Sequence, residues 1–141
     1  ARHAIRQAVL LTQREVADRL LARPGTKAYG RLSVLGQHGW ELTPLLTVPR
    51  RAFFPQPGVD SRCVQLVPRS HPAVPVADEP LFFEVVKQAF SHRRKTLVNC
   101  LSERVSRAQV EAALKTLGLP GSVRGEALSL AQFAALADAL R

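Results

Sequence analysis

Residues 8–25 read AVLLTQREVADRLLARPG, in which a short apolar run is followed directly by a helical pattern. The run lies within residues 4–12, and its length favours a buried strand, although so short a run is also compatible with a helix. The next residues, 13–22, place apolar side chains at helical spacing between charges: Val16, Ala17, Leu20 and Leu21. Pro24 and Gly25 end that helix. A strand that leads directly into a helix predicts an α/β fold for this region.

Outward from this stretch, the sequence predicts a second helix and two further strands. The helix covers residues 28–38 with Thr26 as its N-cap, and the strands cover residues 40–48 and 61–67. Three strands and two helices bury too little apolar surface to offset the conformational entropy that is lost when they become ordered. A sheet of three strands also leaves an edge unpaired. The sequence also contains no Met. Together these observations predict that the chain is a piece of a larger protein.

The remainder of the chain predicts a proline-rich linker and a helical domain. Eight of the ten prolines fall between Pro44 and Pro80, and residues 69–80 show no periodicity, which is typical of a linker. Residues 81–141 contain helical patterns at 81–90 and 95–101. Two further helices follow the capping-box pairs Ser106/Gln109 and Ser129/Gln132, with Gly118 at a helix end.

Composition indicates a globular, basic protein. The 141 residues are 46% hydrophobic, and 20 Lys plus Arg against 11 Asp plus Glu give a net charge of +9. No apolar run is long enough to span a membrane, and no signal peptide is recognisable. Cys63 and Cys100 lack the spacing of metal ligands, so we expect both to be free thiols in the cytoplasm. Sixteen of the cations are Arg, which suits a polyanion such as nucleic acid. A basic surface that contacts only solvent explains the charge equally well.

A proline-rich loop at residues 48–61 is one candidate RNA contact. Pro55 and Pro57 stiffen it, so that Phe53 and Phe54 could stack on a base while Arg50 and Arg51 contact phosphate. In the alternative interpretation both Phe side chains cover the end of the sheet.

A second candidate lies at residues 89–97, where His92 precedes Arg93, Arg94 and Lys95 at an expected helix start. Adjacent like charges favour a phosphate partner, and a solvated helix end is the alternative. Lys27 and Arg31, around a Gly-rich turn, are weaker candidates of the same kind.

No complete active site is visible. The four His show no metal-ligand spacing, and no Walker loop, Gly-x-Ser-x-Gly or Gly-x-Gly-x-x-Gly occurs. Glu15 and Asp18 flank arginines, which indicates exposed ion pairing rather than acid–base catalysis.

Several motifs resemble the small-subunit ribosomal RNA adenine dimethyltransferases, which methylate two adjacent adenines near the 3′ end of that RNA. They lie in family order at residues 11–35, 48–61, 89–101 and 124–129, the last reading Arg124-x-Glu126-x-Leu128-Ser129. Two departures are Gly58, where the family usually has Lys or Arg, and Gly36, where Val or Ala is usual and which we interpret as structural.

The resemblance implies that the chain is the C-terminal half of an S-adenosylmethionine-dependent N6-adenine dimethyltransferase. Residues 1–68 would be the end of a Rossmann-like catalytic domain, residues 69–80 the linker, and residues 81–141 a small all-α RNA-binding domain. The family's cofactor and catalytic motifs would precede Ala1, so the chain alone would be inactive.

The resemblance also implies site residues and partners. Phe53 would stack on the target adenine, and the RNA-binding residues would be Arg93, Arg94, Lys95, Arg50, Arg51, Lys27 and Arg31. Partners would be small-subunit RNA and the immature 30S subunit, bound by a cytoplasmic monomer with no membrane contact. Alternatives are a non-catalytic RNA-binding or ribosome-assembly module, and the related 23S RNA methyltransferase that confers macrolide resistance.

Overall fold

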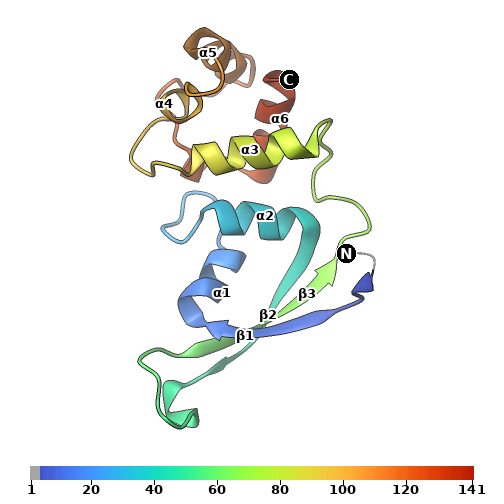
Figure 1. Cartoon of the computed structure of the whole chain (residues 1–141), viewed down its shortest axis with the longest axis vertical. Coiled ribbons are helices and arrows are strands. Elements are labelled where there is room, and N and C mark those ends of the chain that lie inside the picture. The colour runs from blue at the N-terminus through green and yellow to red at the C-terminus, as the bar shows by residue number, and fades with distance from the viewer. Residues whose placement is uncertain (1–3) are drawn as a thin grey trace.

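The computed structural model describes residues 4–141, which form a sheet part and a helical part (Figure 1). The sheet part contains β1 (Ala8–Gln13), α1 (Arg14–Leu21), α2 (Arg31–Gly39), β2 (Trp40–Val48), the 3-10 helix η2 (Arg50–Ala52) and β3 (Ser61–Pro68). The helical part contains α3 (Glu79–Ala89), α4 (Leu97–Leu101), α5 (Arg107–Thr116), the 3-10 helix η3 (Gly125–Ala127) and α6 (Leu130–Ala139). The predicted α/β class of the first part and the helical character of the second are confirmed.

The sheet is antiparallel throughout, with β3 between β1 and β2. Leu10 of β1 pairs with Val64 of β3, and Leu42 of β2 pairs with Leu66. The register of β2 shifts beyond Pro44, which has no N–H to donate to the ladder. Val64 is fully buried, so the central strand carries the best-covered side chain of the sheet.

Both outer strands expose apolar side chains. On β1, Val9, Leu10 and Leu11 are 54%, 45% and 51% exposed, and on β2, Leu45 and Leu46 are 49% and 55% exposed. Soluble proteins usually blunt or cover such apolar edges. Within residues 4–141, β1 pairs only with β3, in agreement with the unpaired edge expected from the sequence.

The molecule is layered, with α1 and α2 on one face of the sheet and the helical part on the far side of α2 (Figure 1). Gly36 allows α2 to approach closely, because a Cβ there would lie 3.0 Å from Leu20 Cδ2 and 3.5 Å from Leu42 Cδ1. The structural interpretation of Gly36 is therefore confirmed.

The main hydrophobic core lies in the helical part and extends into the sheet part. Phe82 of α3 and Phe133 of α6 are fully buried within it, and the same cluster includes Tyr29 and Val34. The segment between β3 and α3, predicted as a linker, also packs on this core, through Val74 and Val76. The two parts consequently share one core, while the domain boundary itself stays a prediction.

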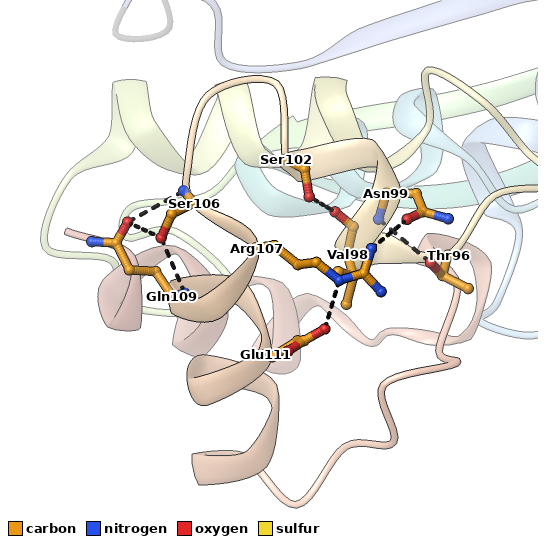
Figure 2. A network of polar contacts seen from close by, with 8 residues as sticks. All are labelled: Thr96, Val98, Asn99, Ser102, Ser106, Arg107, Gln109 and Glu111. Carbon is orange, nitrogen blue, oxygen red and sulfur yellow. Dashed lines mark hydrogen bonds and ion pairs between the residues drawn. The ribbon is translucent and has the colours of Figure 1, made fainter.

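Both predicted capping boxes are confirmed. The Ser106 hydroxyl accepts the Gln109 N–H at the start of α5 (Figure 2), and Ser129 with Gln132 repeats the arrangement at α6. Figure 2 also shows the Arg107 guanidinium bound to Asn99 Oδ1 of α4 and to Glu111 of α5. This network fixes the short helix α4 against α5.

Two predicted helix starts are wrong. Thr26 does not cap α2, because its hydroxyl donates to the Arg23 carbonyl within a turn and α2 begins only after Gly30. The helix expected from residue 95 begins at Leu97, with Thr96 as its N-cap. The basic cluster Arg93, Arg94 and Lys95 therefore lies in the turn before α4 rather than at its first residues.

None of the helices in residues 4–141 has the length and apolar character needed to cross a membrane.

Gly125 provides a test of the packing between η3 and α3. A Cβ at this buried position would lie 2.9 Å from the Ala89 carbonyl oxygen and 3.2 Å from Ala89 Cβ. We expect Gly125→Ala to lower the free energy of unfolding by about 1–3 kcal/mol, measured by urea denaturation. Gly121→Ala is the control, since a Cβ there meets no atom within 4 Å. Equal stability of the two variants would contradict the packing described.

Candidate RNA interface

Four segments of the chain meet around one cleft of about 600 Å³. They are α1 with the preceding Gln13, the turn between α1 and α2, the loop between β2 and β3, and the turn between α3 and α4. The lining residues are Gln13, Arg14, Glu15, Asp18, Arg19, Lys27, Ala28, Arg50, Gly58, Val59, Asp60 and Arg93. A smaller hollow of about 300 Å³ shares Arg19, Ala28 and Arg93 and adds Arg31 and Phe90 among others. We call the two adjoining hollows the basic groove.

The basic groove carries an excess of cations. Its six cations are Arg14, Arg19, Lys27, Arg31, Arg50 and Arg93, and its three acids are Glu15, Asp18 and Asp60. Six positive and three negative charges give the groove a net charge of +3. The acids are already engaged: Glu15 binds Arg19 at 2.7 Å, and Asp18 binds Arg62 at 2.8 Å. Within residues 4–141, Lys27, Arg31 and Arg50 form no ion pair, so their charges face solvent. Such a surface suits a polyanion.

Asp60 closes the loop between β2 and β3. Its Oδ1 accepts the Arg50 N–H at 2.8 Å, and its carbonyl accepts the Arg14 N–H at 3.0 Å. The two ends of the loop are thereby tied to each other and to the start of α1. This bridge places Arg50 and Gly58 in the wall of the groove.

The two aromatic candidates of this loop differ in exposure. Phe54 is fully exposed, whereas Phe53 is half-buried, and its N–H donates to the Arg50 carbonyl. Neither lines either hollow of the basic groove. Arg51, next to the groove-lining Arg50, is exposed. The stacking role of Phe53 stays a prediction.

The three cations of the turn before α4 are not equivalent. The Arg93 Nη2 donates to the Lys27 carbonyl, and Arg93 Nε lies 3.4 Å from Glu126 Oε2. Arg94 and Lys95 are exposed and form no ion pair within residues 4–141. Only Arg93 lines the groove. The sequence predicted the three as one cluster. It also predicted ion pairing of Arg14 and Arg19 on a helix, which is confirmed, but it did not show that both residues line the groove.

Tyr29 joins this surface to the helical part. It is 1% exposed, and its hydroxyl donates to the Leu128 carbonyl at 2.6 Å. Burial raises the pKa of Tyr29 to about 12, because the phenolate is poorly solvated there. Nearby, the Gly25 N–H donates to the Glu126 carbonyl at 2.7 Å. The contacts connect two motifs, residues 25–29 and 124–128, that the sequence shows only as separate patterns.

The groove fits a sulfonium methyl donor poorly. Its net positive charge would repel the donor's cation, and its carboxylates Glu15, Asp18 and Asp60 are already bound by arginines or a backbone N–H. Within the described residues, no group of three or more His, Cys, Asp or Glu side chains could hold a metal ion. The exposed cations of the groove suit binding of a phosphate backbone.

Comparison with known proteins identifies the family of the chain. The sequence model of the ribosomal RNA adenine dimethylase family matches residues 1–141. The chain belongs to this family. It is 48% identical to the ribosomal RNA small subunit methyltransferase A of Geobacillus thermodenitrificans, over 96% of this chain and 48% of that protein. It is 49% identical to the protein of the same name from Streptococcus sanguinis, over 94% of this chain and 48% of that one. The chain thus spans about half the length of these curated relatives.

Solved structures share the fold of this chain. A dimethyladenosine transferase from Plasmodium falciparum superimposes with a TM-score of 0.77 at 24% identity, over 94% of this chain and 56% of that one. The 23S rRNA methyltransferase ErmE gives a TM-score of 0.67 at 28% identity, over 96% and 55% of the two chains.

The Tyr29 hydroxyl provides a pH-dependent test. Because the folded-state pKa of about 12 exceeds the unfolded value of about 10, this group's contribution to stability is present below about pH 10 and lost as the pH rises towards 12. Tyr29→Phe leaves the Leu128 carbonyl unpaired and is expected to cost about 1–3 kcal/mol at neutral pH. It should also flatten the alkaline loss of stability, as measured by urea unfolding. The same alkaline loss in both proteins would contradict this assignment.

Proposed function

We propose that this chain is the RNA-docking half of an enzyme that dimethylates N6 of two adjacent adenines near the 3′ end of small-subunit (16S) ribosomal RNA. The basic groove carries the proposal, since three distant segments bring Lys27, Arg50 and Arg93 to one surface. Family membership and the 48% identity to small-subunit methyltransferases support this substrate over 23S RNA. The alternative of RNA binding without catalysis is an outcome of the test below.

In this proposal the methyl donor is S-adenosylmethionine, held by residues of the whole protein other than the basic groove. The β1 edge would continue into a Rossmann-like sheet, which the exposed Val9, Leu10 and Leu11 support. Residues 1–68 would end the catalytic domain, and residues 81–141, after the linker 69–80, would bind RNA. The chain alone would not methylate.

The proposed task of this chain is to hold the RNA and the target base. Adenine N6 is a weak nucleophile because its lone pair is delocalised into the ring, so the amine must be oriented towards the methyl donor. Phe53 would stack on the flipped adenine. Exposed cations, among them Lys27, Arg31, Arg50, Arg51, Arg94 and Lys95, would contact phosphates. The partner would be the immature 30S subunit, bound by a cytoplasmic monomer.

Methylation of immature small subunits by the whole protein tests the proposal. With a labelled methyl donor, we expect label on N6 of two adjacent adenines near the 3′ end of the small-subunit RNA. Label on large-subunit RNA with drug resistance would favour the macrolide-resistance alternative, and binding without label would favour the non-catalytic one. Phe53→Ala should lower turnover with little change in docking, whereas the fully exposed Phe54 can be replaced by Ala as a control. Equal losses in the two variants would contradict the role of Phe53.

Gly58 offers a gain-of-charge test of the groove. It lines the groove, and a Cβ there meets no atom within 4 Å, so a longer side chain is accommodated. Gly58→Lys should tighten binding of single-stranded RNA and steepen its salt dependence by up to about 0.7 log units per log unit of salt. Gly121→Lys adds the same charge at an equally open position that lines neither hollow. Equal effects of both variants would contradict RNA binding in the groove.

A further inference from the structure

Arg93 connects three segments of the chain. It belongs to the turn before α4, and its guanidinium contacts the Lys27 carbonyl in the turn between α1 and α2. Its Nε also lies 3.4 Å from the Glu126 carboxylate in η3. Two of its donor groups are therefore occupied by the protein itself, and a phosphate that used both would have to displace Glu126.

The main chain around Glu126 reaches the same turn. The Glu126 carbonyl accepts the Gly25 N–H at 2.7 Å, and Gly25 has a φ of +82°, which glycine adopts without strain. The Leu128 carbonyl accepts the Tyr29 hydroxyl at 2.6 Å. Four polar contacts thus join residues 25–29, Arg93 and residues 124–128 to one another. The joined turn carries Lys27, one of the cations of the groove.

Arg94 and Lys95 lack such contacts. Both are exposed, and neither forms an ion pair within the part of the chain that the structure describes. The helix that follows them is fixed separately, because Thr96 caps α4 and Asn99 binds Arg107 of α5 (Figure 2). The turn is held on both sides while two of its cations remain available to a ligand.

We propose that Arg93 and Glu126 are positioning residues, which fasten the Lys27 turn to the helical part so that the cations of both parts form one surface. Arg94 and Lys95, rather than Arg93, then supply the phosphate contacts of the cluster, a step that rests on the proposed RNA-binding function. The adjacent Arg-Arg-Lys residues accordingly have two different tasks.

A double-mutant cycle in the 141-residue chain tests the positioning pair without RNA. Glu126→Gln removes the charge but keeps the main-chain carbonyl that binds Gly25. We expect Arg93→Ala and Glu126→Gln each to speed hydrogen exchange of the Gly25 amide about two- to fivefold, with no further increase in the double variant. The amide of Val64, in the central strand, serves as the internal reference. Additive effects, or an unchanged Gly25 amide, would overturn the proposal.

The salt dependence of binding to a short single-stranded oligoadenylate distinguishes the role of Arg94 from that of Arg93. Arg94→Ala should flatten it by up to about 0.7 log units per log unit of salt and leave Gly25 exchange unchanged. Arg93→Lys keeps the charge but loses the planar fork, so it should speed Gly25 exchange and keep the slope. A slope lowered in Arg93→Ala as much as in Arg94→Ala, with normal Gly25 exchange, would overturn the proposal. If the chain does not bind RNA, the proposed function is wrong. The double-mutant cycle is measured without RNA, so it still tests whether Arg93 and Glu126 position the Lys27 turn.

Discussion

The buried hydrogen bond from the Tyr29 hydroxyl to the Leu128 carbonyl connects the two parts of the molecule. Around it, the core of the helical part extends to Tyr29 and Val34, and the Gly25 N–H binds the Glu126 carbonyl. Because a buried polar group without a partner is costly, this donor and acceptor constrain how the sheet part and the helical part fit together. The position of the Lys27 turn, and with it one wall of the basic groove, depends on that fit.

The groove shows how a basic surface is assembled from an ordinary composition. Its cations come from α1, the first residue of α2, two turns and one loop, and Asp60 fixes the loop through Arg50 and Arg14. Glu15 and Asp18 neutralise part of the charge on α1, whereas Lys27, Arg31 and Arg50 stay available. The positions of the individual cations, rather than the net charge of the groove, therefore distinguish this surface. That arrangement supports the proposed RNA-docking role.

Local patterns predicted the local structure well. Apolar spacing located the strands and helices, and the pairs Ser106/Gln109 and Ser129/Gln132 identified two helix starts, because each depends on neighbouring residues. Thr26 failed as a cap because its hydroxyl binds a turn carbonyl instead. The ion pair of Arg93 joins it to Glu126, 33 positions later in the sequence, and no local pattern predicts it. The motifs at residues 25–29 and 124–128 were visible in the sequence, but only the fold shows that they contact each other.

We propose that RNA lies in the basic groove, where the sheet part and the helical part meet. The most direct measurement is a residue-by-residue NMR titration of the chain with single-stranded RNA. We expect the largest amide shifts at the groove residues Lys27, Arg31, Arg50 and Gly58, with little change at Lys115 at the end of α5, which lines neither hollow. Shifts confined to α5 and α6, or no shifts at low salt, would contradict the account.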